Sequence, residues 1–347
     1  MIRPLSILGT GGITLPLIDN ANLLQYLNAP KDGAWLERKV GIQTHSLNFD
    51  CATGKKIDQN DGLDYAVMAA FEAMQNAGIS ADEIDQICYT TCTPRNLHFM
   101  ADTIELHRIL GLRPTAIVDQ IDGGCAALAK GFQLAKLYAN GKNPNWKALI
   151  VGSNDVASMI NKERYELVPY AWQSPSIFGD GAGAVVLGHG EGKPWLDKVY
   201  CAVNGDHPLV TYEGGGTAHP TSMATLNGHV YVMDGPDVAT QFGPAMTRGL
   251  DNLLVQAGLT VDDVERFYLH QANLRLIHLF ARSKKIPMDR IPHNVDRFGN
   301  TVSASTLLLL NEDMQNGLEF RKPILFCYVG AGMMEGGALF LPGDKVT

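Results

Sequence analysis

Segments that are apolar throughout alternate along the chain with segments in which apolar residues recur at helical spacing. Residues 87–89, 148–152, 267–269 and 324–330 are short apolar runs of the kind found in strands buried on both faces. Each run follows a longer amphipathic segment that predicts a helix. Strands and helices alternating in this order indicate mostly parallel sheets covered on both faces, and therefore an α/β fold.

One helix–turn–strand unit occurs twice. The run NAGISADEID at 76–85 is matched without a gap by QAGLTVDDVE at 256–265, with chemically similar residues at nearly every position. In both copies a predicted helix, 65–76 or 244–256, ends at a glycine suited to a left-handed cap. An internal repeat of this kind indicates a duplicated architecture.

A second unit extends the repeat. Cys125 opens a predicted helix over 126–139 that precedes one apolar strand, and Thr301 opens a similar helix that precedes another. Two such α/β halves facing each other predict a five-layered α-β-α-β-α sandwich with an internal pseudo-two-fold duplication. We expect the first half to span residues 1–190 and to carry the cysteine, and the second to span 191–347.

Composition and charge exclude some classes of function. The 347 residues are 46% hydrophobic and 18% charged, which is ordinary for a soluble globular protein. A net charge of −8 and the lack of a Lys/Arg block argue against nucleic acid as the main partner. The apolar N-terminal stretch is too short for a signal peptide or a membrane span. The six cysteines follow no disulfide or zinc-site framework, so we expect reduced thiols in a cytoplasmic protein.

Cys125 is the candidate nucleophile. It lies between two glycines and a run of small residues that begins a predicted helix. The positive end of the helix dipole favours thiolate over thiol at such a position, and the glycines allow a substrate to approach the backbone. The alternative interpretation is a small residue buried for packing, which is the commoner role of an isolated cysteine.

His270 and Asn300 are the candidate partners of the cysteine. His270 is predicted to lie where a buried strand ends and a helix begins, a position that is often functional in α/β folds. Asn300 occupies, in the second repeat, the region that corresponds to Cys125 in the first. A structural histidine and a helix N-cap asparagine are the alternatives. The pseudo-symmetry is what predicts that all three residues meet.

These motifs together resemble those of a known family. Gly-Cys at a helix start, His-Gln-Ala-Asn at 270–273 and Gly-Asn-Thr at 299–301 are similar, in order and spacing, to the Cys-His-Asn triad of β-ketoacyl-acyl-carrier-protein synthase III. The glycine-rich run at 178–185 and the closing run at 330–332 are also similar to that family, whose fold is the thiolase fold. The resemblance covers residues 5 to 341.

The resemblance implies a two-stage condensation without a metal or redox cofactor. Cys125 would take an acyl group from an acyl-CoA or acyl-carrier-protein thioester, with the backbone N–H groups of Cys125 and Gly332 forming the oxyanion hole. A malonyl thioester, on acyl carrier protein or CoA, would then lose CO₂. His270 and Asn300 would stabilise the resulting enolate, which attacks the acyl-cysteine and releases a β-ketoacyl product.

The resemblance also implies binding residues and an assembly. Trp35 and Lys39 correspond to positions that contact the adenine end of CoA. Arg275 corresponds to a basic residue near the CoA phosphates or the carrier-protein docking surface. Members of the family form homodimers, in which the region 97–100 would reach toward the neighbouring active site.

Several departures from the family pattern concern the substrate. Gly123 and Gly124 stand where small alanines are usual, and Asp119 lies one residue farther from the cysteine than expected. Met333 and the two residues after it stand where an aromatic is common. We therefore expect a specialised branch, in polyketide or other secondary metabolism, rather than the enzyme that initiates fatty acid biosynthesis.

Three alternatives remain open from the sequence. An acyltransferase of the same fold would pass the acyl group to an oxygen or nitrogen nucleophile, although it would not need the asparagine. A non-decarboxylative synthase would join two acyl chains with a glutamate base. Phe99 stands where that base is expected, but Glu105 is nearby. The third alternative is an inactive partner in a heteromer, which an intact triad disfavours.

Overall fold

The computed structural model describes residues 4–96, 100–139, 143, 145–160, 162, 171–212, 214–225 and 231–343. Its main sheet has nine strands in the order β11-β12-β13-β8-β1-β7-β6-β4-β5. These are β1 (Ser6–Thr14), β4 (Gln86–Thr91), β5 (Ile117–Gln120), β6 (Ala148–Asn154), β7 (Gly181–Gly188), β8 (Trp195–Val203), β11 (Arg266–Leu269), β12 (Ile324–Gly330) and β13 (Met334–Leu341). Two small sheets pair β2 (Leu17–Asp19) with β3 (Thr44–Ser46) and β9 (Val210–Tyr212) with β10 (Tyr231–Met233).

The same sequence of strand pairings occurs on both sides of the main sheet. Strands β1 and β7 pair antiparallel, as do β7 and β6, and β6 pairs parallel with β4. On the other side β8 and β13 pair antiparallel, as do β13 and β12, and β12 pairs parallel with β11. A single residue pair, Ser6 with Trp195, connects the two sets. The predicted internal duplication is therefore confirmed in the topology. The prediction of mostly parallel sheets is wrong, because five of the eight pairings of the main sheet are antiparallel and three are parallel.

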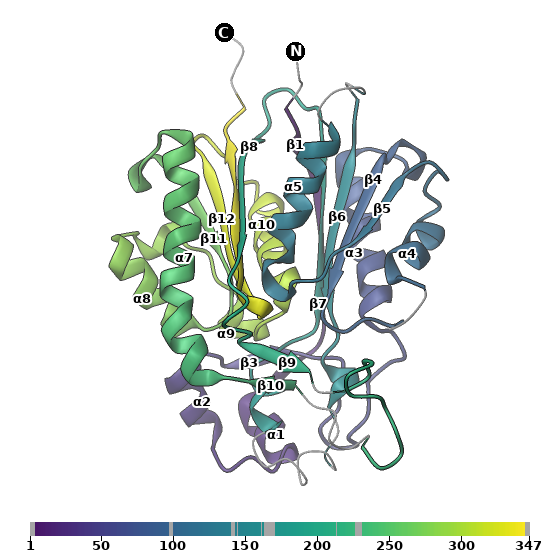
Figure 1. Ribbon diagram of the computed structural model, residues 1–347, viewed down its shortest axis with the longest axis vertical. Helices are drawn as coiled ribbons and strands as arrows, with labels where there is room; N and C mark the ends of the chain where they lie inside the picture. Colours follow the sequence, from purple (N-terminus) through teal and green to yellow (C-terminus); the bar gives the residue numbers. More distant parts are fainter. Residues whose placement is uncertain are drawn as a thin grey trace.

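Helices cover both sets of strands in layers. They are α1 (Asn20–Tyr26), α2 (Gly33–Val40), α3 (Gly62–Ala77), α4 (Asp102–Leu110), α5 (Ala127–Ala139), α7 (Gly235–Ala257), α8 (Leu274–Lys284), α9 (Val295–Phe298) and α10 (Ser305–Gln315). In Figure 1, α3 and α4 lie outside the first set of strands, α7 and α8 lie outside the second, and α5 and α10 lie between the two. The predicted five-layered sandwich is confirmed.

The repeated units end in the same way. Gly78 and Gly258 cap α3 and α7 in the left-handed conformation, with φ of 68° and 67°. The next turn is closed in both copies by an acidic side chain that accepts a backbone N–H: Glu83 from Ser80 at 2.9 Å, and Asp263 from Thr260 at 2.8 Å. Matching caps explain why the pattern was visible in the sequence.

Several predicted helix starts differ from the structure. Helix α7 begins at Gly235, nine residues before the predicted start at 244, because the Asp234 side chain accepts the Asp237 N–H and caps the helix there. The helices predicted after Cys125 and Thr301 each begin with a short 3-10 turn, η2 (Gly124–Ala126) and η8 (Val302–Ala304). In the part of the chain that the structure describes, no helix has the length and apolar character needed to cross a bilayer.

Candidate active site

The three predicted catalytic residues line one cavity. Cys125 lies in η2 at the start of α5, His270 directly follows β11, and Asn300 precedes η8. All three contribute to a cavity of about 880 Å³. The duplication brings them together, because η2 and η8 lie against each other between the two sets of strands. The constellation predicted from separate motifs is thus present in the structure.

Glycines allow the backbone around Cys125 to pack closely against the second half. Gly124 has a φ of 53°, a left-handed value that glycine adopts without strain. A methyl group on Gly330, at the end of β12, would lie 2.5 Å from the Gly123 carbonyl oxygen. Position 330 therefore requires glycine and position 124 favours it, and the two glycines allow the nucleophile to lie close to the 330–332 turn.

Burial controls the protonation of Cys125. It raises the pKa of the thiol well above its ordinary range, the nearby Cys92 raises that pKa further, and a hydrogen bond with the Asn300 side chain acts in the opposite direction. The helix position alone predicted a shift toward thiolate, and the structure shows the opposite direction because desolvation is the larger effect. The resting residue is a thiol, so acyl transfer must include removal of its proton.

His270 is held as a neutral imidazole. Its backbone N–H donates to the Cys327 carbonyl at 2.9 Å, which continues the pairing of β11 with β12 by one residue. The side chain is 4% exposed, and its ring lies 6.1 Å from the Phe242 ring. Burial lowers the pKa of His270 to about 3. At neutral pH the ring can therefore donate one hydrogen bond without carrying a positive charge.

Asn300 is held by a local contact but is not the N-cap of η8, which is Thr301. Its side-chain oxygen accepts the Val302 N–H at 2.9 Å. The side chain also forms the hydrogen bond with Cys125. The contact with Val302 restricts the rotamer of the amide that meets the cysteine. Val302 has a φ of 53°, a conformation that strains a β-branched residue.

The structure contradicts the predicted role of Gly332. Its N–H donates to the Pro208 carbonyl at 2.9 Å, and Gly332 does not line either cavity described here. Gly332 has a left-handed conformation, with φ of 71° and ψ of 15°. The preceding residue, Ala331, lines both cavities. The turn is therefore in place, but the residue that faces the nucleophile is one position earlier than predicted.

Trp35, Lys39 and Arg275 line the same large cavity as the triad. The Trp35 and Trp172 rings meet edge to face at 6.1 Å. The Arg275 guanidinium donates to the carbonyls of Glu37 and Arg38, at 3.0 and 3.2 Å, and so connects α8 to the last turn of α2. The cavity therefore extends from an aromatic and basic rim to the sulfur of Cys125.

Glu105 does not face the cysteine of its own chain. Its carboxylate accepts hydrogen bonds from Arg95 and Asn96, both at 3.2 Å, and it does not line either cavity described here. The carboxylate of Glu105, the alternative base, is therefore paired with the Arg95 guanidinium. Phe99 and the other residues of 97–99 lie outside the described residues.

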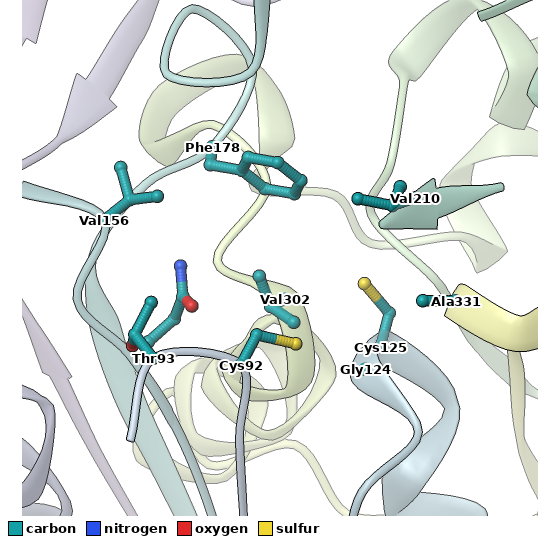
Figure 2. Close-up of a pocket in the computed structure, with 10 residues that line it drawn as sticks. Cys92, Thr93, Gly124, Cys125, Val156, Phe178, Val210, Val302 and Ala331 are labelled. Carbon is teal, nitrogen blue, oxygen red and sulfur yellow. The ribbon is translucent and has the colours of Figure 1, made fainter. Parts of the chain in front are cut away.

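A small cavity of about 50 Å³ adjoins Cys125 and was not predicted. Figure 2 shows Val210 and Ala331 on the Cys125 side of this cavity and Val156 and Thr93 on the opposite side. Its wall is largely apolar and is completed by Cys92, Gly124, Asn154, Phe178 and Val302. Cys92 directly follows β4, so the rule that singled out His270 at a strand end would also have found it.

Comparisons with known proteins agree with the geometry. Residues 120–203 match the family model of 3-oxoacyl-[acyl-carrier-protein] synthase III, and residues 254–341 match the model of its C-terminal part. The β-ketoacyl-[acyl-carrier-protein] synthase III of Rickettsia prowazekii is 29% identical over 339 residues, 96% of this chain and 98% of the relative. That of Xanthomonas campestris is 30% identical over 307 residues, 88% of both chains.

Solved structures share the fold. The 3-oxoacyl-[acyl-carrier-protein] synthase III of Aquifex aeolicus superposes with a TM-score of 0.81 at 22% identity, over 97% of this chain and 99% of that one. A tetronic acid condensing enzyme superposes with a TM-score of 0.83 at 22% identity, over 97% and 99%. OleA of Xanthomonas campestris, solved with cerulenin, gives 0.81 at 17% identity, over 98% and 97%.

Proposed function

Because the chain belongs to the β-ketoacyl-[acyl-carrier-protein] synthase III family and is an acyl-transferring condensing enzyme, we propose that it carries an acyl group on Cys125 and joins it to a malonyl thioester with loss of CO₂. The product is a β-ketoacyl thioester. The observation that supports this most directly is the meeting of Cys125, His270 and Asn300 in one cavity that extends to Trp35, Lys39 and Arg275.

In the first step, the Cys125 sulfur attacks the carbonyl carbon of an acyl thioester. The thiol proton leaves as the bond forms, and the departing CoA or carrier thiolate takes up a proton in its place. Neutral His270 lines the same cavity, and the unprotonated nitrogen of its ring can accept a hydrogen bond from the thiol as the proton passes toward the leaving thiolate. We assign the oxyanion hole to the backbone N–H groups of Cys125 and Ala331, since the Gly332 N–H is bonded to Pro208.

In the second step, His270 and Asn300 donate hydrogen bonds to the thioester oxygen of the malonyl group. Loss of CO₂ leaves an enolate whose negative charge develops on that oxygen. Two neutral donors stabilise this charge without protonating the carbon that must react. The carbanion attacks the acyl-cysteine carbonyl, the carbon–sulfur bond breaks, and the Cys125 thiolate is released and reprotonated.

The two cavities assign places to the substrate. The acyl chain would extend into the small apolar cavity between Cys92, Phe178 and Val302, whose size favours a short chain. The pantetheine arm of CoA or of acyl carrier protein would lie in the large cavity, with its charged end near Lys39 and Arg275. No metal or redox cofactor takes part in this scheme.

Three further points belong to the proposal. The chain acts as a homodimer, with β5, the last strand of the main sheet, as the edge that pairs with a second copy. The enzyme works in the cytoplasm, where a nucleophilic thiol stays reduced. The changes around the nucleophile, Gly123 and Gly124 before it and Met333 after the turn, favour a specialised pathway over the initiation of fatty acid biosynthesis.

The test is intact-protein mass spectrometry after mixing with a panel of acyl-CoAs, followed by malonyl-carrier protein. We expect an adduct on the wild-type chain that Cys125→Ala lacks and that malonyl-carrier protein discharges as a β-ketoacyl product forms. Cys201→Ala is the matched control, because Cys201 lies on β8 and lines neither cavity. An adduct that survives in Cys125→Ala would refute the assignment of the nucleophile. An adduct that malonyl-carrier protein cannot discharge would refute the condensation step.

A further inference from the structure

We propose that His207 and Asp237 are positioning residues for acyl transfer, because their pair holds the segment that orients the 331–333 turn beside Cys125. The inference rests on the proposed acylation of Cys125 and on Ala331 as the residue of the turn that faces it. Neither His207 nor Asp237 lines a cavity described here. Their effect must therefore act through other residues.

Residues 204–210, which connect β8 to β9, hold the turn from two sides. The Gly332 N–H donates to the Pro208 carbonyl at 2.9 Å, and the Asn204 N–H donates to the Met333 carbonyl at 3.0 Å. Met333 itself has a φ of 36°, an unfavourable value for a residue with a side chain. Such a conformation persists only where neighbouring contacts impose it. Segment 204–210 supplies these contacts.

Segment 204–210 is itself held against the start of α7. The His207 Nδ1 atom lies 3.0 Å from the Asp237 carboxylate, in the first turn of that helix. The Asp234 N–H, at the helix cap, donates to the Leu209 carbonyl at 2.9 Å. In Figure 1, β9 and β10 lie across the lower ends of β8 and α7, where these contacts are made.

A continuous series of contacts thus runs from α7 to the nucleophile. Asp237 binds His207, the next residue Pro208 binds Gly332, and the residue before Gly332 lines the cavity beside Cys125. The oxyanion donor must meet the developing negative charge within a few tenths of an ångström, and a displacement of about 1 Å can reduce a rate 100-fold. Loss of the His207–Asp237 contact would free segment 204–210 to shift and would misalign this donor.

The same loss should leave thioester binding almost unchanged. Trp35 and Lys39 lie on α2, and Arg275 lies on α8, so the residues proposed to hold the charged end of CoA lie outside segment 204–210, whose Leu209 and Val210 supply apolar wall to the cavities. A positioning role therefore predicts a slower acylation of bound substrate with little change in the KM. A general loss of folding would instead reduce the fraction of active protein and leave the rate of that fraction the same.

The experiment compares acylation rates of three variants with the wild type, by quenched-flow intact mass spectrometry over a range of acyl-CoA concentrations. His207→Leu removes the hydrogen-bonding atoms, Asp237→Asn removes the charge, and His207→Asn keeps an N–H donor near the place of Nδ1. Asp251→Asn is the matched control, since Asp251 lies on the same helix and forms a surface pair with Lys284 at 2.7 Å.

We expect His207→Leu to slow acylation at saturating acyl-CoA about 10-fold or more, with the KM within about 2-fold of wild type. His207→Asn should recover most of the rate, and Asp251→Asn should match the wild type. The inference is overturned if His207→Leu and Asp237→Asn acylate normally, if His207→Asn is as slow as His207→Leu, or if the loss lies only in the KM. Absence of an adduct on the wild type would overturn the proposed function itself, and this inference with it.

Discussion

The two halves of the molecule build the same local structure and use it differently. In each half a 3-10 turn precedes a central helix, η2 before α5 and η8 before α10. The first residue of each turn, Gly124 in one half and Val302 in the other, has the same φ of 53°. In the first half that residue is glycine and the next one is the nucleophile. In the second half it is valine, and its side chain forms part of the wall of the small cavity.

This difference shows how a duplicated frame becomes an asymmetric site. A glycine adopts a left-handed conformation without strain and leaves space beside Cys125 for a substrate. A valine in the same conformation is strained, and the hydrogen bond from its N–H to the Asn300 side chain helps to hold it there. The strained residue therefore donates the hydrogen bond that helps to orient the Asn300 side chain. The contrast between the two halves leads to four predictions, ordered from the largest expected effect to the smallest.

Replacing the nucleophile should abolish the function of the first half. Cys125→Ala should reduce condensation at least about 1000-fold, because it removes the sulfur that is proposed to carry the acyl chain. The measurement is the rate of β-ketoacyl product formation from acyl-CoA and malonyl-carrier protein. Retention of more than a small fraction of this activity would show that the acyl-enzyme is not on the path.

Removing the amide of the second half should affect mainly the second step. Asn300→Ala should lower condensation about 100-fold, because one of two hydrogen bonds to the enolate oxygen is lost. Acylation of Cys125 should continue, so the acyl-enzyme should accumulate and be visible by intact mass. If acylation and condensation fall together by the same factor, Asn300 acts mainly by maintaining the cavity.

Acid should destabilise the protein through His270. The pKa of His270 is about 3 in the folded chain, below the ordinary 6.5, so between these values the unfolded chain binds a proton that the folded chain does not. The free energy of unfolding should therefore fall as the pH decreases below about 6.5, by on the order of 1 kcal/mol per pH unit from this residue.

Denaturant unfolding at pH 7 and pH 5 measures this effect. His270→Asn, which keeps a neutral polar side chain, should lose less stability than the wild type between the two pH values. His45 is also buried with a lowered pKa, about 4, and it is present in both proteins, so its contribution cancels in the comparison. Equal losses in the two proteins would show that His270 is not held neutral.

The separate substitutions Val302→Gly and Gly124→Val, at the two left-handed positions, should have unequal effects on stability. Val302→Gly loses buried side-chain contacts but also relieves backbone strain, and each effect is on the order of 1–3 kcal/mol. Because the two effects oppose each other, the free energy of unfolding should change by no more than about 1 kcal/mol. Gly124→Val adds backbone strain at a φ of 53°, and it removes no strain in exchange, although a Cβ there would meet the Ala331 nitrogen at an ordinary contact distance of 3.4 Å. Thermal unfolding of the two variants tests this order, and a larger loss for Val302→Gly would contradict it.

The α/β class and the duplication could be predicted from local patterns, but the antiparallel pairing of most strands could not. The strands β4, β6, β11 and β12 appeared as apolar runs, and the repeated caps revealed the duplication, because both depend on interactions between residues close in sequence. The candidate catalytic residues could also be predicted, since their motifs lie at strand ends and helix starts. The start of α7 was missed because Pro244 lies inside the helix and resembles a helix beginning.

What only the tertiary structure decided is how atoms face one another across the two halves. Ala331 rather than Gly332 faces the cavity because Pro208, more than 120 positions earlier, accepts the Gly332 N–H. Burial by both halves keeps Cys125 a thiol and His270 neutral, although helix position alone predicted a thiolate. The sequence determined the elements and the reactive residues through short-range propensity. Orientation and protonation depend on contacts between distant segments, because desolvation and hydrogen-bond geometry are properties of the assembled cavity.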